Sequence, residues 1–264
     1  MRSSRFAKSG LGIPYALFLL LFVVAPLFVL LYYAFTNGQG QFTVQNLAAF
    51  FTSPNTIGTL AYSFALAVVT TCVCVLLAYP IAYILARSNM RHKSVILVAF
   101  VMPMWINFTL RITALKEILT VLEGNLALHP FLNSVIGMTY DFLPFMILPM
   151  YTTLMKLDTS LIEAAGDLGA NPVQTFLKVT LPLSVPGIIS GITMVFVPAL
   201  TTFVISNLLG GSKILLIGNV IEQEFTKGSN WNLGAGLSIV LMVFILLSMT
   251  MIAKYDKDGE GSAF

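Results

Sequence analysis

Charged residues are scarce in this chain. Asp, Glu, Lys and Arg together make up 9% of its 264 residues, whereas hydrophobic residues make up 57%. Soluble domains usually carry about 25% charged residues. This scarcity excludes an ordinary soluble globular protein and predicts a chain that crosses a membrane several times.

Several kinds of chemical site are also missing. The two cysteines, Cys72 and Cys74, lack the CxxC spacing of a redox or zinc site, and we expect them to be small buried residues on different helix faces. His92 and His129 lie in predicted loops, and no His/Asp/Glu cluster falls within an apolar segment. A Gly-rich phosphate loop is absent from the sequence. We therefore expect a protein that is not an enzyme, binds no metal or cofactor of its own and does not itself hydrolyse ATP.

Six apolar segments are long enough to cross a membrane as helices. The first covers about residues 13–35, which is too long for the apolar region of a signal peptide, roughly 7–15 residues. The other five cover about residues 57–86, 94–115, 135–157, 183–208 and 231–253, and the third of the six is interrupted by Pro103. The sequence thus predicts an all-α membrane protein, with one transmembrane domain over residues 1–264 and a five-span core over about 57–253.

The basic residues give an orientation. Six spans place both termini on one side of the membrane, and that side carries ten of the fourteen Lys and Arg residues. These ten are Arg2, Arg5, Lys8, Arg87, Arg91, Lys93, Lys156, Lys178, Lys254 and Lys257; the other four are Arg111, Lys116, Lys213 and Lys227. Because cytoplasmic loops are enriched in Lys and Arg, both termini are expected to be cytoplasmic.

A polar stretch over residues 158–182 separates the fourth and fifth spans. Ser160 and Glu163 have the spacing of a capping box at a helix start, and Gly169 is placed to end that short helix. Asn171 followed by Pro172 predicts the start of a second helix, which Pro182 is expected to end. The stretch therefore predicts two short helices joined by a glycine turn, on the same side as the termini.

This stretch resembles the EAA loop of ABC-transporter permeases. The family pattern is EAA, three residues, G, nine residues and I-x-L-P, and the chain departs from it only by Val179 in place of isoleucine. The resemblance implies a type I ABC importer transmembrane domain whose cytoplasmic coupling helix docks on an ATPase subunit. The residues implied in coupling are Glu163, Ala164, Ala165, Asp167, Gly169, Leu181 and Pro182. An ordinary loop between two spans is the alternative.

Further stretches are similar to the PotB-type permeases of spermidine/putrescine importers. They are residues 103–107 with Arg111 and Ile112, residues 143–146 with Pro149, residues 163–170, residues 206–211 and residues 216–221. The resemblance implies that the chain moves polyamines into the cytoplasm by alternating access. It also implies a second homologous permease subunit, a dimer of ATPase subunits that uses ATP and Mg, an extracytoplasmic substrate-binding protein and a location in the inner membrane, among lipids and without nucleic acid.

Two other functions stay open from the residues. One is an ABC permease for another small solute, such as phosphate, sulfate or iron. The other is an ion-coupled secondary transporter that uses Asp141 as a proton or sodium site. An anion carrier is expected to place basic groups and helix N-termini in its path, and a secondary transporter needs no coupling loop.

Asp141 is the one acidic residue inside a predicted span. It lies six residues into the fourth span, about 9 Å from the outer end at 1.5 Å per residue. An ionisable group at membrane depth usually faces a bundle interior or a wet cavity. Asp141 is therefore either a site for a cation that enters from outside or the partner of Arg111, and a cationic ligand that competes with Arg111 would satisfy both.

Four further side chains are candidates for the substrate path. Trp105 lies near the middle of the third span, where it either packs in a core or offers a cation–π surface to an ammonium group. Tyr140, next to Asp141, is a similar candidate. Asn107 and Asn207 are amides at membrane depth or at its edge, for which hydrogen bonding between helices is the alternative role.

Overall fold

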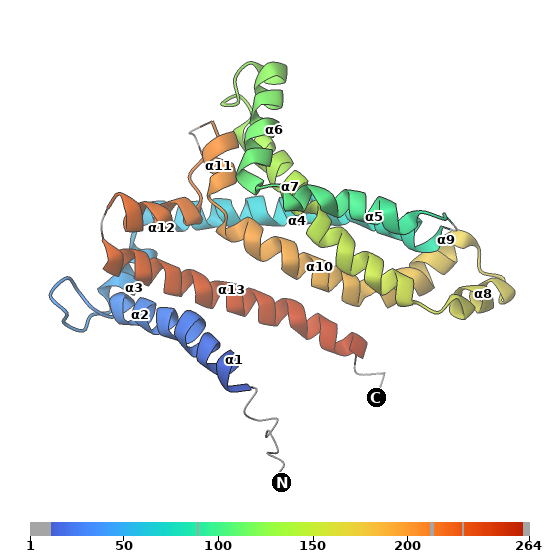
Figure 1. Cartoon of the computed structure of the whole chain (residues 1–264), viewed down its shortest axis with the longest axis horizontal. Helices are drawn as coiled ribbons and strands as arrows, with labels where there is room; N and C mark the ends of the chain where they lie inside the picture. Colours follow the sequence, from blue (N-terminus) through green and yellow to red (C-terminus); the bar gives the residue numbers. More distant parts are fainter. Residues whose placement is uncertain (1–11, 89, 212–213, 229, 261–264) are drawn as a thin grey trace, which may run out of the picture. The chain divides into compact units, whose positions relative to one another are not determined.

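The computed structural model describes residues 12–88, 90–211, 214–228 and 230–260. The regular secondary structure of these residues is helical, with one isolated bridge between Thr36 and Phe42. The helices labelled in Figure 1 are α1 (Gly12–Leu19), α2 (Ala25–Ala34), α3 (Gln45–Thr52), α4 (Pro54–Arg87), α5 (Lys93–Val101), α6 (Phe108–Glu123), α7 (Pro130–Lys156), α8 (Thr159–Asp167), α9 (Pro172–Thr175), α10 (Leu181–Thr201), α11 (Val204–Leu209), α12 (Ile217–Thr226) and α13 (Trp231–Glu260). Of the basic residues used for the orientation, Arg2, Arg5, Lys8 and Lys213 lie outside the described residues.

Within the described residues, five helical segments are long and apolar enough to cross a membrane. They are Ile13–Ala34, Thr56–Arg87, Pro130–Lys156, Pro172–Thr201 and Trp231–Ile252. A sixth span exists if the bent pair Lys93–Trp105 and Phe108–Glu123 is counted as one. The prediction of an all-α membrane protein is thereby confirmed, whereas the fifth span begins and ends earlier than the predicted residues 183–208.

The third predicted span, residues 94–115, is not a single straight helix. A 3-10 turn, Met102–Trp105, follows α5, and the extended backbone of Ile106 then redirects the chain by 95° into α6. Pro103 explains the break, because its ring and missing N–H oppose continuation of an α-helix. Trp105 consequently lies at a corner between two helices and is 78% exposed in the chain, so the alternative in which it packs in a core was wrong.

The chain divides into two compact units, one made of the residues up to Ile57 with Ile221–Phe244, and the other of Gly58–Val220 with the residues from Ile245 on. In the first unit, Ala34 packs with Ala235 and Ile239. Carbonyls at the end of α2 and just after it accept hydrogen bonds from two asparagine side chains. The Nδ2 of Asn46 donates to Ala34 O at 3.1 Å, and that of Asn232 donates to Thr36 O at 2.6 Å.

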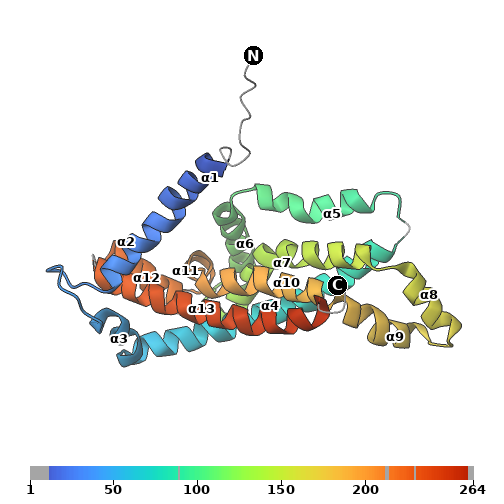
Figure 2. The ribbon, with the colours of Figure 1, turned by 90° about the horizontal axis from the view of Figure 1, so that it is seen from below.

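In the second unit, α7 and α10 pack side by side (Figure 1). Gly187 and Gly191 make the close approach possible, since an added Cβ at Gly187 would lie 3.0 Å from Pro149 O and 2.6 Å from Thr153 Oγ1. Such spacing of small residues is typical of membrane helices that pack closely. Pro144 and Pro149 lie within α7 without ending it, and α8 and α9 connect its last turn to α10 (Figure 2). The prediction of a single permease domain over residues 1–264 stays a prediction.

Candidate functional site

The polar stretch between α7 and α10 forms the predicted pair of short helices. Asp158, and not Ser160, is the N-cap of α8: its Oδ1 accepts the Ser160 N–H at 2.9 Å. The predicted capping box of Ser160 and Glu163 was therefore wrong, because the Asp158 carboxylate already accepts the Ser160 N–H that the Glu163 side chain was expected to accept. Hydrogen bonds from the Ser160 backbone and side chain hold the pKa of Asp158 below its usual value.

Gly169 makes the turn between the two helices, as predicted. Its φ is +83°, a left-handed conformation that favours glycine. The Gly169 N–H donates to Gly166 O at 2.9 Å and the Ala170 N–H donates to Ala165 O at 3.0 Å, which is the paired pattern of a Schellman motif. Both bonds use carbonyls at the end of α8, so the turn has a defined shape.

The second short helix begins where the sequence placed it. Asn171 caps α9 by accepting the Gln174 N–H at 2.8 Å, while the Gln174 side chain accepts the Asn171 N–H at 3.0 Å. Pro182 does not end this helix, which was a wrong expectation. A π-helical turn, Phe176–Thr180, precedes Pro182, and the helical path runs on from Pro172 to Thr201.

The two-helix segment presents both charge and apolar surface. Glu163, Ala164 and Asp167 are exposed, and neither acid forms an ion pair with another described residue. The exposed apolar side chains in or next to these helices are Leu161, Leu168, Val173 and Leu177. Leu181 and Pro182 lie at the start of α10. We call residues 158–175 the coupling segment. Exposed apolar side chains next to carboxylates without an ion-pair partner are typical of a protein-docking surface.

A second candidate site lies at the bend between α5 and α6. A cavity of about 390 Å³, which we call the bend cavity, is lined by Trp105, Asn107, Phe108, Arg111, Asp141 and Phe145, among others. Arg111 of α6 forms an ion pair with Asp141 of α7 through its Nη2 atom, and both side chains are 7% exposed. The structure thus places Asp141 as the partner of Arg111 and, together with it, on the wall of a cavity.

The ion pair is incompletely satisfied. Arg111 Nε and Nη1 are buried without a hydrogen-bond partner among the described residues. Its guanidinium carbon lies 5.8 Å from the ring centroid of Tyr140, within cation–π range. A buried ion pair with open donors gains less from its attraction than it costs to desolvate, so it is weak evidence for a purely stabilising role.

Asp141 lies deeper than expected. Because α7 begins at Pro130 rather than near Val135, Asp141 is eleven residues from the helix start, about 16 Å. Pro130 is favoured in the first turn of a helix because its missing N–H would be unpaired there anyway. The predicted position about 9 Å from the helix end was wrong, and the carboxylate lies near the middle of α7.

The two asparagine candidates have local structural roles. Asn107 caps α6, since its Oδ1 accepts the Thr109 N–H at 2.9 Å, but it also lines the bend cavity. Asn207 does not line that cavity; its Oδ1 accepts a hydrogen bond from Asn219 Nδ2 at 2.7 Å. Hydrogen bonding between helices thus describes Asn207, on α11, and Asn219, on α12.

Asn219 is a residue that the sequence analysis did not single out. It is fully buried, accepts hydrogen bonds from Ser206 Oγ and Leu216 N, and donates to Phe203 O in addition to Asn207. These bonds hold the irregular backbone at the start of α11 and of α12. Non-helical backbone at membrane depth is tolerated where polar groups satisfy it in this way.

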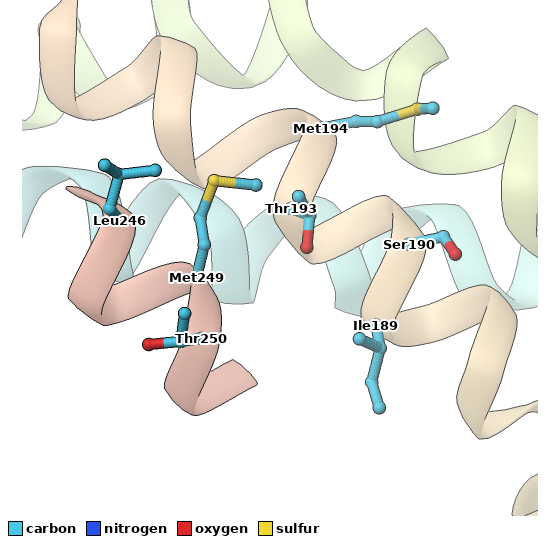
Figure 3. Close-up of a pocket in the computed structure, with 7 residues that line it drawn as sticks. All are labelled: Ile189, Ser190, Thr193, Met194, Leu246, Met249 and Thr250. Carbon is cyan, nitrogen blue, oxygen red and sulfur yellow. The ribbon is translucent and has the colours of Figure 1, made fainter. Parts of the chain in front are cut away.

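A larger groove of about 490 Å³ lies between α10 and α13. Figure 3 shows its lining, in which Thr193 and Met194 come from α10 and Met249 and Thr250 from α13. Its polar groups are hydroxyls, and no ionisable side chain lines it. The bend cavity is therefore the better candidate for recognition of a charged solute.

Comparisons with known proteins agree with this architecture. Residues 78–257 match the family described as "Binding-protein-dependent transport system inner membrane component". The spermidine/putrescine transport system permease protein PotB of Haemophilus influenzae is 34% identical over 97% of this chain and 96% of its own. PotB of Escherichia coli K12 is 38% identical over 72% of this chain and 74% of its own.

Solved structures show the same fold at low sequence identity. A bacterial alginate ABC transporter in complex with its alginate-bound periplasmic protein has a TM-score of 0.73 at 14% identity, covering 95% of this chain and 93% of that one. Another structure of a bacterial alginate importer has a TM-score of 0.68 at 15% identity, covering 95% and 94%. The chain is a multi-pass membrane transport component and belongs to the family of binding-protein-dependent transport system inner membrane components.

Proposed function

We propose that this chain is a permease subunit of an ABC importer that moves polyamines into the cytoplasm by alternating access. The observation that carries the proposal is the 34% identity over nearly the whole chain to a spermidine/putrescine permease. A buried carboxylate beside a cavity supports it, because a polyamine presents ammonium groups that must replace their water with other contacts.

The bend cavity is the proposed substrate site. Asp141 offers the carboxylate to an ammonium group, and Trp105 offers an aromatic face. Tyr140 does not line the cavity; its ring lies 5.8 Å from the guanidinium carbon of Arg111. Asn107 lines the same cavity and offers an amide. Asn207 lies in the Asn219 network instead, so its predicted place in the path stays a prediction. An ammonium that takes the place of Arg111 at Asp141 exchanges one ion pair for another, and this limits the cost of removing the cation from water.

The coupling segment is the proposed docking surface for an ATPase subunit. Glu163, Ala164 and Asp167 are exposed on α8, and Gly169 fixes the turn that follows. ATP and Mg are bound and used by a dimer of such partner subunits, and this chain binds no cofactor of its own. A second homologous permease and an extracytoplasmic substrate-binding protein complete the proposed complex, with both termini and the coupling segment on the cytoplasmic side of the inner membrane.

The proposal predicts ATP-dependent uptake of spermidine and putrescine. The experiment uses proteoliposomes that contain the chain, its partner permease and the ATPase subunits, with the binding protein added inside or outside to match the orientation. We expect these two polyamines, and not phosphate, sulfate or iron, to stimulate ATP hydrolysis and to accumulate. Stimulation by an anion alone would assign another solute, and uptake driven by an ion gradient without ATP would assign a secondary transporter.

A second prediction concerns the glycine turn of the coupling segment. Gly169→Val should lower transport about tenfold, because a left-handed backbone costs an L-residue about 1–2 kcal/mol and the turn must distort to relieve it. The measurement is polyamine uptake and ATPase co-purification at matched permease levels.

Gly124→Val is the matched control for this substitution. Gly124 has a φ of +71° and, like Gly169, no atom within 4 Å of an added Cβ, but it lies after α6, outside the coupling segment. The control also has a positive φ, which strains any L-residue, and it should keep its ATPase. Equal loss of ATPase binding in both variants would remove Gly169 from the coupling role.

A further inference from the structure

A π-helical turn follows the coupling segment, between α9 and α10. Between Phe176 and Thr180 the helix is π-helical, and the Leu181 N–H donates to Phe176 O, five residues earlier. The cause is the next residue, because the ring of Pro182 would clash in an α-helix with the carbonyl of Lys178. A π-helical turn moves that carbonyl aside, and single π turns of this kind are frequent at functional sites.

Proline alone does not explain the packing around this turn. A second π turn, Leu20–Val24, lies just before Pro26, but none of its residues is buried. At the turn in question, the Phe176 ring lies between Tyr79 and Tyr83 of α4, with ring centroids 5.7 and 5.5 Å apart and interplanar angles of 85° and 87°. Thr180, at the end of the same turn, is 1% exposed. This π turn is therefore held by neighbours as well as required by its proline.

Tyr79 contacts the helix on both sides of the turn. Its ring packs on Phe176, and its hydroxyl lies 2.8 Å from Ser184 Oγ. Because Ser184 gives its own proton to Leu181 O at 2.8 Å, Tyr79 is the donor in that hydrogen bond. One tyrosine of α4 thus contacts both Phe176, which begins the π turn, and Ser184, two positions after Pro182.

The coupling segment reaches this turn directly. Helix α8 packs against both α9 and the π turn. A displacement of α8 and α9 is therefore transmitted to α10 through a turn whose hydrogen-bonding register differs from that of the helix on either side. The same displacement is transmitted to α4 through the contacts of the Phe176 ring.

We infer that the π turn Phe176–Thr180 is the joint through which movement of the coupling segment reaches α4 and α10, and that Phe176 is the positioning residue of this joint. The inference rests on the proposed function, since it requires an ATPase that moves the coupling segment. Its distinctive consequence is a change in substrate molecules taken up per ATP hydrolysed, which loss of packing elsewhere does not produce.

The chain offers a matched control for the aromatic contact. Phe64 of α4 and Phe196 of α10 join the same two helices edge to face, with centroids 5.7 Å apart and an angle of 82°, away from the joint. Phe176→Leu and Phe196→Leu each remove one ring and keep an apolar side chain. In the reconstituted complex, Phe176→Leu should lower uptake per ATP about tenfold while ATP hydrolysis continues. Phe196→Leu should lower thermal stability and leave the ratio unchanged.

Two further variants separate positioning from folding. Phe176→Tyr keeps the aromatic ring and should therefore show the wild-type uptake per ATP hydrolysed. Tyr79→Phe keeps the ring and removes only the hydrogen bond to Ser184, so a ratio about fivefold lower is expected without a packing defect. A wild-type ratio in both Phe176→Leu and Tyr79→Phe, or the same fall in Phe196→Leu, would overturn the inference.

Failure of the proposed substrate gives a different result. In that case the wild-type complex takes up neither spermidine nor putrescine, whatever residue occupies position 176. The comparison of Phe176→Leu with Phe196→Leu is then made with the solute that does stimulate ATP hydrolysis.

Discussion

Replacement of Arg111 by glutamine is expected to destabilise the folded chain by about 3–5 kcal/mol, the usual effect of leaving one member of a buried ion pair without its partner. Both side chains are 7% exposed, so water compensates poorly for the missing charge. Asp141→Asn should be destabilising for the same reason. The double variant should regain most of the stability, because no unpaired charge remains. Thermal unfolding of the purified complex measures all three.

Polyamine uptake by the same variants separates the two roles of Asp141. If the Asp141 carboxylate both pairs with Arg111 and binds substrate, the double variant is stable but takes up little polyamine. This is the outcome we expect. Lys116→Gln, also on α6 but outside the pair, is the control and should leave both properties unchanged. A double variant with normal stability and normal uptake would limit Asp141 to a structural ion pair.

Gly187→Val is expected to disrupt the packing of α7 on α10 and to cost about 3 kcal/mol or more, near the upper end of the range for overpacked cores. An added Cβ would lie 3.0 Å from Pro149 O, and a backbone oxygen cannot rotate away. Gly191→Ala should cost less, because the nearest atom there is the sulfur of Met146, at the flexible part of its side chain. Yield and thermal unfolding of the complex give the comparison.

The matched control for Gly187→Val is Gly58→Ala on α4, where an added Cβ meets nothing within 4 Å. It should be neutral or slightly stabilising, since alanine is the better helix former. Equal stability of Gly187→Val and wild type would show that α7 and α10 do not pack through this glycine in the membrane.

Short-range patterns in the sequence predicted much of the fold and of the coupling segment. The first span, the glycine turn at Gly169 and the cap at Asn171 depend on residues a few positions apart, and the structure confirms each. The choice of Asp158 over Ser160 as the cap of α8 was missed because both have side chains that can cap a helix, and only the backbone conformation of Asp158 decides between them.

Features that depend on direction or on distant partners were not predicted. Hydropathy measures the length of an apolar segment but not a 95° bend within it, so Trp105 was placed inside a span rather than at a corner. Asn219 resembles many polar residues near a helix start until its four hydrogen-bond partners are seen together. The pairing of Arg111 with Asp141 was one of two alternatives that the residues alone left open, and the fold brings the two together.

The end of α2 has a consequence for how the chain is made. Thr36 O accepts hydrogen bonds from Asn46 and from Asn232, and the second of these donors is 196 residues further along the chain. At a synthesis rate of about 5–20 residues per second, Asn232 leaves the ribosome about 10–40 s after Thr36. During that interval the side-chain donors at this end of the first span are Asn46 and the Thr36 hydroxyl, which donates to Tyr32 O. Its C-terminal end therefore becomes complete only when the last membrane helix is inserted, which makes early and late steps of biogenesis dependent on each other.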